Sequence, residues 1–223
     1  MKIRNTSLCY FLSIFGLVLV LFLSGISYAS DDWRLEKDKE NIKVYIRNTP
    51  NSAVKSFMGK MRVKTNLTAL VSILNDTPNY PRWLFNTQTA KTISRTSDEI
   101  STNYVVTNMP WPVADRDAVI VSNRTQNPAN KRVEIILSAV PLKIPKVKGK
   151  VRIENLKGRW LFTPVNNNQV DIEYEMSIDP GGNIPKWVVN AMVVDLPFNT
   201  LKNMRKLSKE GKYLNSKIKG IVN

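Results

Sequence analysis

The chain has 223 residues, with 33 Lys and Arg against 18 Asp and Glu and a formal net charge of +15 at pH 7. It contains no His and a single cysteine, Cys9, so a histidine base, an intramolecular disulfide and a multi-cysteine zinc site are excluded. Binding remains, or catalysis by carboxylate, lysine, tyrosine or serine side chains.

The N-terminal segment has the pattern of a secretory signal. Lys2 and Arg4 precede an apolar stretch at residues 8–23, and small side chains stand at Ser27 and Ala29. The apolar stretch is short for a membrane span. We therefore expect cleavage after Ala29 and export to the periplasm or the medium, with an uncleaved inner-membrane anchor as the alternative.

The remaining residues, 30–223, carry no cysteine and must be held together by a hydrophobic core. No repeat or low-complexity linker divides them. We predict a signal peptide at residues 1–29, one monomeric domain at residues 30–210 and a basic tail at residues 211–223.

Alternation of apolar and polar residues predicts two strands, at residues 42–47 and 57–64. The period then changes at Asn66, a good N-cap for a short helix with Leu67, Leu70 and Leu74 at helical spacing. Further strands are predicted at residues 90–96, 102–107, 117–125, 133–140, 148–153, 159–163 and 170–178. The last alternates cleanly, which is typical of an antiparallel sheet with one wet face.

A long helix is predicted after the turn at residues 179–183. Pro185 suits the first turn of a helix, and residues 186–194 are apolar on more than one face. We expect that segment to be enclosed or to slide against an apolar surface. Pro197 is expected to kink or break the helix, and a more polar helix to follow at residues 199–212.

Four stretches in this order resemble a known family. They are Tyr80–Trp83, Pro110–Asp117, Gly149–Ile153 with Gly158–Pro164, and Asp179–Trp187 with Asn190. Together they are similar to the START lipid-transfer family, whose domain is named after the steroidogenic acute regulatory protein. The resemblance covers about residues 33–206, most of the chain after the signal segment.

The resemblance implies an α+β helix-grip fold, in which a curved antiparallel sheet wraps around a long C-terminal helix and encloses an apolar cavity. The implied function is to hold one hydrophobic molecule, a lipid or a similar small molecule, and to carry it between membranes. Residues 184–206 would be the lid. An apolar cavity favours such a guest, because burial stabilises it by about 0.8 kcal/mol per methylene group.

The resemblance also suggests residues that touch the ligand. Some family members place an arginine and an acidic residue in the tunnel, which here points to Arg116 and Asp117. A buried guanidinium needs a partner, and Asp117, Asp115 and Glu99 are the candidates. The alternative is that Arg116 only joins adjacent strands. The candidate wall residues, which could equally be ordinary core, are Trp83, Trp111, Trp160, Trp187 and Met192.

Two basic clusters remain, the alternating cations from Lys146 to Arg152 and the segment from Lys202 to Lys219. Each could contact an anionic membrane surface transiently, or could simply be a solvated face.

Two other functions stay open. One is a helix-grip enzyme of the polyketide cyclase or aromatase type, with Glu99, Asp115 and Tyr174 as proton-transfer groups. The other is a nucleic-acid binder. Only the positive net charge favours it, because basic and aromatic residues are not interleaved. We predict no catalytic residues, no metal site, no cofactor and no nucleic-acid partner.

Overall fold

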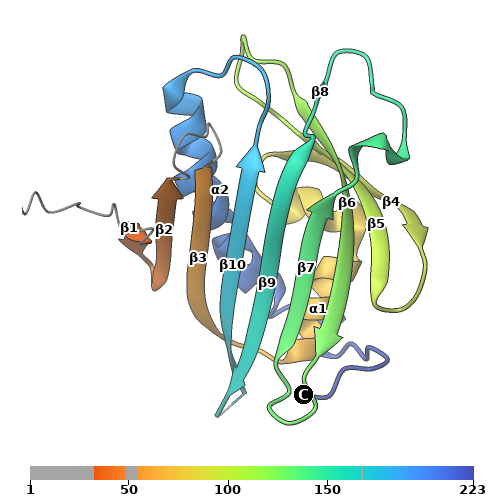
Figure 1. Ribbon diagram of the computed structural model, residues 1–223. Coiled ribbons are helices and arrows are strands. Elements are labelled where there is room, and N and C mark those ends of the chain that lie inside the picture. Colours follow the sequence, from red (N-terminus) through yellow and green to blue (C-terminus); the bar gives the residue numbers. More distant parts are fainter. Residues whose placement is uncertain (1–32, 49–54, 167) are drawn as a thin grey trace, which may run out of the picture. The chain divides into compact units, whose positions relative to one another are not determined.

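The computed structural model describes residues 33–48, 55–166 and 168–223. The predicted signal segment and its cleavage site lie outside these residues. The described residues form a ten-stranded sheet, antiparallel except for one pairing, with helices on one face (Figure 1). None of the helices they form combines the length and the apolar character that a membrane span needs.

The sheet order is β1-β2-β3-β10-β9-β7-β6-β5-β4, and β8 pairs in parallel with β6. The strands are β1 (Arg34–Lys39), β2 (Ile42–Asn48), β3 (Lys55–Lys64), β4 (Thr87–Arg95), β5 (Ile100–Thr107), β6 (Arg116–Gln126), β7 (Val133–Ala139), β8 (Val151–Arg152), β9 (Asn155–Val165) and β10 (Gln169–Asp179). The helices are α1 (Leu67–Asn75), α2 (Lys186–Leu207) and α3 (Gly211–Leu214), with 3₁₀ helices η1 (Thr77–Arg82) and η2 (Pro141–Lys143).

The alternation predicted for the central strands is confirmed. On β10, Val170, Ile172, Tyr174 and Met176 are buried in the main core. The opposite face carries cross-strand ion pairs, such as that of Asp171 with Arg62 on β3. The sheet curves around the helices and buries one face against them, which confirms the predicted helix-grip fold (Figure 1).

The predicted N-cap of the first helix is also confirmed. Asn66 has an extended backbone, and its Oδ1 accepts a hydrogen bond from the backbone N–H of Ala69 at 2.8 Å. This bond satisfies one of the free N–H groups at the helix start.

A kink or a break was predicted at Pro197, and the break is wrong, because α2 continues through this residue to Leu207. Pro197 is buried and faces Gly59 of β3, where a Cβ atom would lie 3.4 Å from the Cβ of Pro197. Without a side chain at Gly59 the helix can approach the sheet closely. We attribute the intact helix to this packing, which offsets the hydrogen bond that proline cannot donate.

The predicted strand at residues 148–153 is mostly wrong, since only Val151 and Arg152 are extended. The backbone N–H of Lys150 donates to the oxygen of Val147, and Gly149 has a φ of 80°, so the chain turns there. The four cations therefore do not share one strand face, and Arg152 is buried.

β1 and η1 are among the elements that were not predicted. β1 is a charged edge strand that pairs with β2 alone, and its residues do not alternate in polarity. η1 contains two prolines, Pro78 and Pro81, which mask any helical period.

The predicted basic tail folds back onto the domain. The Oδ1 atom of Asn223 accepts from the backbone N–H of Thr68 at 3.0 Å, at the start of α1. The side chain of Gln126, at the end of β6, bonds the N–H and the oxygen of Val222 at 2.9 and 2.8 Å. Residues 215–223 therefore form a strap from α1 to β6.

Candidate functional site

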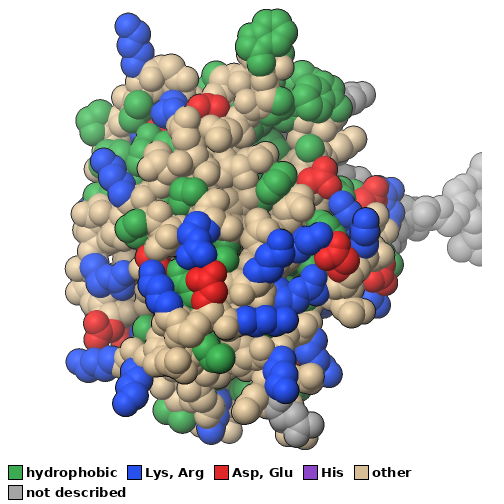
Figure 2. Space-filling view, turned by 180° about the vertical axis from the view of Figure 1, so that it is seen from behind, with side chains coloured by type: hydrophobic (Ala, Val, Ile, Leu, Met, Phe, Trp, Pro, Cys, Tyr) green, Lys and Arg blue, Asp and Glu red, His purple; other side chains and the backbone are tan. Residues whose placement is uncertain are grey.

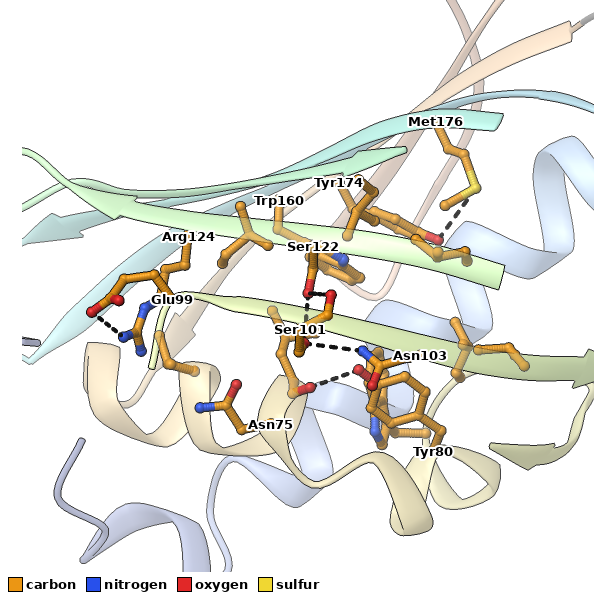
Figure 3. Close-up of a pocket in the computed structure, with 18 of the residues that line it drawn as sticks. Asn75, Tyr80, Glu99, Ser101, Asn103, Ser122, Arg124, Trp160, Tyr174 and Met176 are labelled. Carbon is orange, nitrogen blue, oxygen red and sulfur yellow. Dashed lines mark hydrogen bonds and ion pairs between the residues drawn. The ribbon is translucent and has the colours of Figure 1, made fainter. Parts of the chain in front are cut away.

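A cavity lies between the helical segment α1–η1 and the inner faces of β5, β6, β7, β9 and β10 (Figure 3). It holds about 750 Å³ of space free of protein atoms, part of it open to solvent. Its helical wall includes Val71 and Leu74, Leu84 follows η1, and its sheet wall includes Val105, Ile120, Ile135 and Leu137.

One end of the cavity is aromatic. The rings of Trp160 and Tyr174 stack with centroids 3.8 Å apart, and Trp83 meets Trp160 edge to face at 6.0 Å. Burial raises the pKa of the Tyr174 hydroxyl far above its usual range, and the nearby Tyr80 adds to the shift. The aromatic end therefore stays neutral.

A chain of hydrogen bonds runs along the sheet wall. Asn103 accepts from the hydroxyl of Thr92 at 2.9 Å and donates to the hydroxyl of Ser101 at 3.3 Å. The hydroxyls of Ser101 and Ser122 lie 2.9 Å apart (Figure 3). These polar groups bond one another, so they can line an apolar space without a guest.

The other end of the cavity carries Arg124, whose side chain is only 6% exposed. Its Nη2 atom donates to the backbone oxygens of Asp98 at 3.1 Å and Lys219 at 3.4 Å, and lies 3.7 Å from the carboxylate of Glu99. Burial lowers the pKa of the Arg124 guanidinium, Glu99 and Asp98 partly offset this, and the like charge of Arg95 adds to it.

Within the described residues, three buried side-chain atoms have no hydrogen-bond partner. Two of them, Arg124 Nη1 and Trp83 Nε1, belong to residues that line the cavity, and the third is Thr87 Oγ1. Both cavity atoms are hydrogen-bond donors.

A second recess lies beside the first half of α2. It is lined by Trp187, Val188, Ala191 and Met192 of α2 and by the segment Thr107–Pro110. Leu84 lines the cavity and the next residue, Phe85, lines the recess, so this pair stands between the two spaces.

The predicted ligand-contact residues are spread over these spaces. Trp83, Trp160 and Glu99 line the cavity, and Trp187 and Met192 line the recess. The prediction for Trp111 does not fit, because this side chain is 91% exposed on the β5–β6 connection and lines neither space.

Arg116 and Asp117 do not line the cavity either. The guanidinium of Arg116 donates to the backbone oxygens of Ala114, Pro180 and Gly181, just before α2. Asp117 pairs instead with Arg152. Of the three candidate partners of Arg116, Asp117 is wrong, since consecutive strand residues point to opposite faces of a sheet, and Glu99 lies beside Arg124 instead. Burial lowers the pKa of Arg116, and the nearby charge of Asp115 partly offsets this.

Sequence reasoning missed Arg124 and the polar residues Ser101, Asn103 and Ser122. A signal was present, because Ala118, Ile120, Ser122 and Arg124 alternate along β6 and share its inner face. This pattern alone does not show which face of β6 lines a cavity.

Comparison with known proteins agrees with this architecture. The family model of the START domain matches residues 17–212. An uncharacterized protein of Pseudomonas aeruginosa is 32% identical over 176 residues, which is 79% of this chain and 86% of that protein.

Two solved structures share the fold. A fragment of a STAR-related lipid transfer protein from Xanthomonas axonopodis superposes with a TM-score of 0.74 and 35% identity, over 81% of this chain and all of that fragment. Human STARD10 gives a TM-score of 0.69 at 21% identity, over 81% of this chain and 74% of that one.

Proposed function

The chain belongs to the START domain family, and we propose that it binds one lipid molecule in the cavity and carries it between membranes. The observation that carries the proposal is the hollow, largely apolar space behind β5 and β6, closed at one end by Trp83, Trp160 and Tyr174. Burying an alkyl chain there gains about 0.8 kcal/mol per methylene group.

The proposed path for a long guest uses both spaces. A chain that outgrows the cavity would pass Leu84 and Phe85 and enter the recess beside Trp187 and Met192. In this proposal Trp83, Trp160, Trp187 and Met192 are wall residues, and α2 moves when the guest enters or leaves.

We propose that the protein acts without catalysis. Of the proton-transfer groups considered from the sequence, Tyr174 donates its hydroxyl to the sulfur of Met176, with its pKa raised by burial. Asp115 accepts from the backbone N–H of Met109 and pairs with Lys150, away from the cavity lining. Glu99 stands at the arginine end, so the three do not converge on one point in the cavity.

Contact with a membrane is proposed for the end of the sheet where β5–β6, β7–β8 and β10–α2 connect (Figure 1). Trp111 is 91%, Leu142 92% and Trp187 58% exposed there, and hydrophobic side chains protrude from this end in Figure 2. The exposed Lys143 and Lys148 are near them in the chain. Aromatic and cationic side chains together suit an anionic membrane surface.

The basic tail is a weaker candidate for that contact. Lys202 pairs with Glu40, Lys212 with Asp76 and Lys219 with Asp98. The strap at residues 215–223 lies at the opposite end of the sheet from the β5–β6 connection (Figure 1). We therefore propose one docking end, with the signal segment at residues 1–29 directing export to the periplasm or medium.

The proposal is tested by native mass spectrometry of protein purified from its own host, followed by solvent extraction. We expect one bound lipid per chain, and its absence from the variant Ile120→Trp, which fills the cavity. Asn123→Trp is the matched control, because Asn123 is exposed on the other face of β6. A wild-type chain that co-purifies with no lipid and binds none on addition would contradict the proposal.

A further inference from the structure

Two sets of polar groups at the cavity differ in their hydrogen bonding. Those of Thr92, Ser101, Asn103 and Ser122 are occupied by bonds to one another. In the described part of the chain, Arg124 Nη1 and Trp83 Nε1 are buried without a partner. A buried donor without an acceptor is costly, and the cost is larger for a charged group. The buried, unsatisfied atoms at the cavity are therefore donors, and a guest that accepts hydrogen bonds would satisfy them.

The charged residues that line the cavity also favour a guest that accepts hydrogen bonds. The charged residues that line the cavity are two arginines, Arg95 and Arg124, and one carboxylate, Glu99. Glu99 is 47% exposed and 3.7 Å from Arg124, whose side chain is 6% exposed. A solvated carboxylate at this distance compensates a buried guanidinium only in part.

Arg124 lies at one end of the cavity, so the charged contact and the aromatic contacts of a guest would be at opposite ends. Figure 3 shows Arg124 and Glu99 together at one end of the cavity, and Tyr174 and Met176 at the other. A guest with a polar head and an apolar tail would fit this polarity in one orientation.

We infer that the guest is an amphiphile with a single anionic head, a carboxylate or a phosphate, and that the head binds Arg124 at the strap end of the cavity. The inference rests on the proposed function and adds the chemical class of the ligand. The tail would then extend toward the aromatic end at Trp160 and Tyr174, and a longer tail would pass Leu84 and Phe85 into the recess. This order suits a lipid that leaves a membrane head first, since its head faces the docked protein.

The test uses four amphiphiles that share one dodecyl chain and differ in the head. Dodecanoate and monododecyl phosphate are anionic, dodecanol is neutral and dodecyltrimethylammonium is cationic. Each is titrated into the delipidated full chain by calorimetry below its critical micelle concentration. We expect at least one anion to bind about ten- to a hundredfold more tightly than dodecanol, as a charge-assisted bond to Arg124 implies. The cation should bind most weakly.

A variant tests whether Arg124 causes the preference for an anionic head. Arg124→Met keeps the apolar stem and should reduce the affinity for the preferred anion to that for dodecanol, while dodecanol binding stays unchanged. Arg62→Met is the matched control, because it removes the same charge from the outer face of β3, where Arg62 pairs with Asp171. It should leave all four affinities unchanged. If Arg124→Met does not fold, the comparison on the wild-type chain still decides.

The outcomes separate this inference from the proposed function. Equal or tighter binding of dodecanol than of both anions would overturn the anionic head while leaving a lipid carrier intact. An anion preference that survives in folded Arg124→Met would overturn the role of Arg124. If none of the four amphiphiles binds, the proposed function and the inference fail together. The two anions tell a carboxylate head from a phosphate head.

Discussion

Asp117 and Arg152 form a bidentate ion pair, with Nε and Nη2 of the arginine each 2.9 Å from one carboxylate oxygen. Both side chains are 1% exposed. The carboxylate also accepts from the hydroxyl of Tyr104, and burial together with that bond raises the pKa of Tyr104 to about 12. The pair ties β6 to β8 on the face of the sheet opposite the cavity.

Asp117→Asn should destabilise the fold by about 3–5 kcal/mol, because it leaves the Arg152 charge buried without its counter-ion. The loss is measured as the urea unfolding midpoint at constant m-value. The double variant Asp117→Leu with Arg152→Met should recover part of it. Recovery will be incomplete, since Arg152 also donates to the backbone oxygens of Pro141, Ile144 and Pro145.

Arg62→Met is the control for this prediction. Its pair with Asp171 is about half exposed, at 56% and 42%. Exposed pairs contribute about 0–1 kcal/mol. A loss in Asp117→Asn no larger than in Arg62→Met would show that the buried pair is not structural.

Arg116→Met should leave ligand affinity unchanged, because Arg116 is not among the residues that line the cavity. It should instead weaken the contacts that hold the segment before α2 in place. The guanidinium is 3.2 Å from the oxygen of Pro180 and 2.9 Å from that of Gly181. Hydrogen exchange of the amides at residues 188–194 should become about tenfold or more faster, as the loss of charge-assisted bonds implies. A folded variant with weakened ligand binding and unchanged exchange would restore a ligand role for Arg116.

Arg116 and Arg124 show how much of the site could be predicted from the sequence. The alternation on β10 and the cap at Asn66 depend on neighbouring residues, so their patterns predicted them correctly. The partner of Arg116 depends on the loop before α2, far along the chain, and no local pattern encodes it. Arg124 could be assigned to the inner face of β6 by alternation, but its free Nη1 follows only from the packing around it.

Gly59→Ala should destabilise the fold by about 1–3 kcal/mol, the cost of overpacking a core. The new Cβ would lie 2.7 Å from Cδ1 of Leu201, which is fully buried in α2. Thermal unfolding at one protein concentration measures the change. Gly211→Ala is the control, because the nearest atom to its Cβ would be 3.7 Å away. Equal stability of the two variants would mean that α2 does not rest closely on β3.

Trp111→Ser should reduce association with anionic liposomes about tenfold or more, since a buried large apolar side chain contributes about 1.5–3 kcal/mol. The folded state should change by less than about 0.5 kcal/mol, because the ring is exposed. Co-sedimentation at low and high salt measures binding, which salt should weaken. Ile136→Ser is the control, being 44% exposed on β7 away from the docking end. Equal liposome binding of both variants would contradict the proposed docking end.

Asp76 should make the contact between α1 and α3 sensitive to acid. Burial alone would raise the pKa of its carboxyl, but hydrogen bonds from Lys212, Asn79 and Tyr213 and the charge of Lys212 outweigh burial and lower it. A lowered pKa in the folded state means that the unfolded chain takes up the proton first as the pH falls. The stabilisation is therefore complete above about pH 5 and is lost as the pH falls below about 4, the ordinary pKa of aspartate.

Asp76→Asn measures this contribution. At pH 7 the variant should be less stable than the wild type by about 1.5 kcal/mol, the lower end for bonds to a charged group, because the Asn oxygen can still accept. The difference should shrink below pH 4 and vanish once the wild-type carboxyl is protonated in the folded state. Asp171→Asn, which removes an exposed pair with Arg62, should cost less than about 1 kcal/mol at pH 7. A difference between Asp76→Asn and the wild type that stays constant from pH 7 to pH 2 would assign the loss to packing, because the other carboxyls titrate in both proteins and only the titration of Asp76 can change the difference.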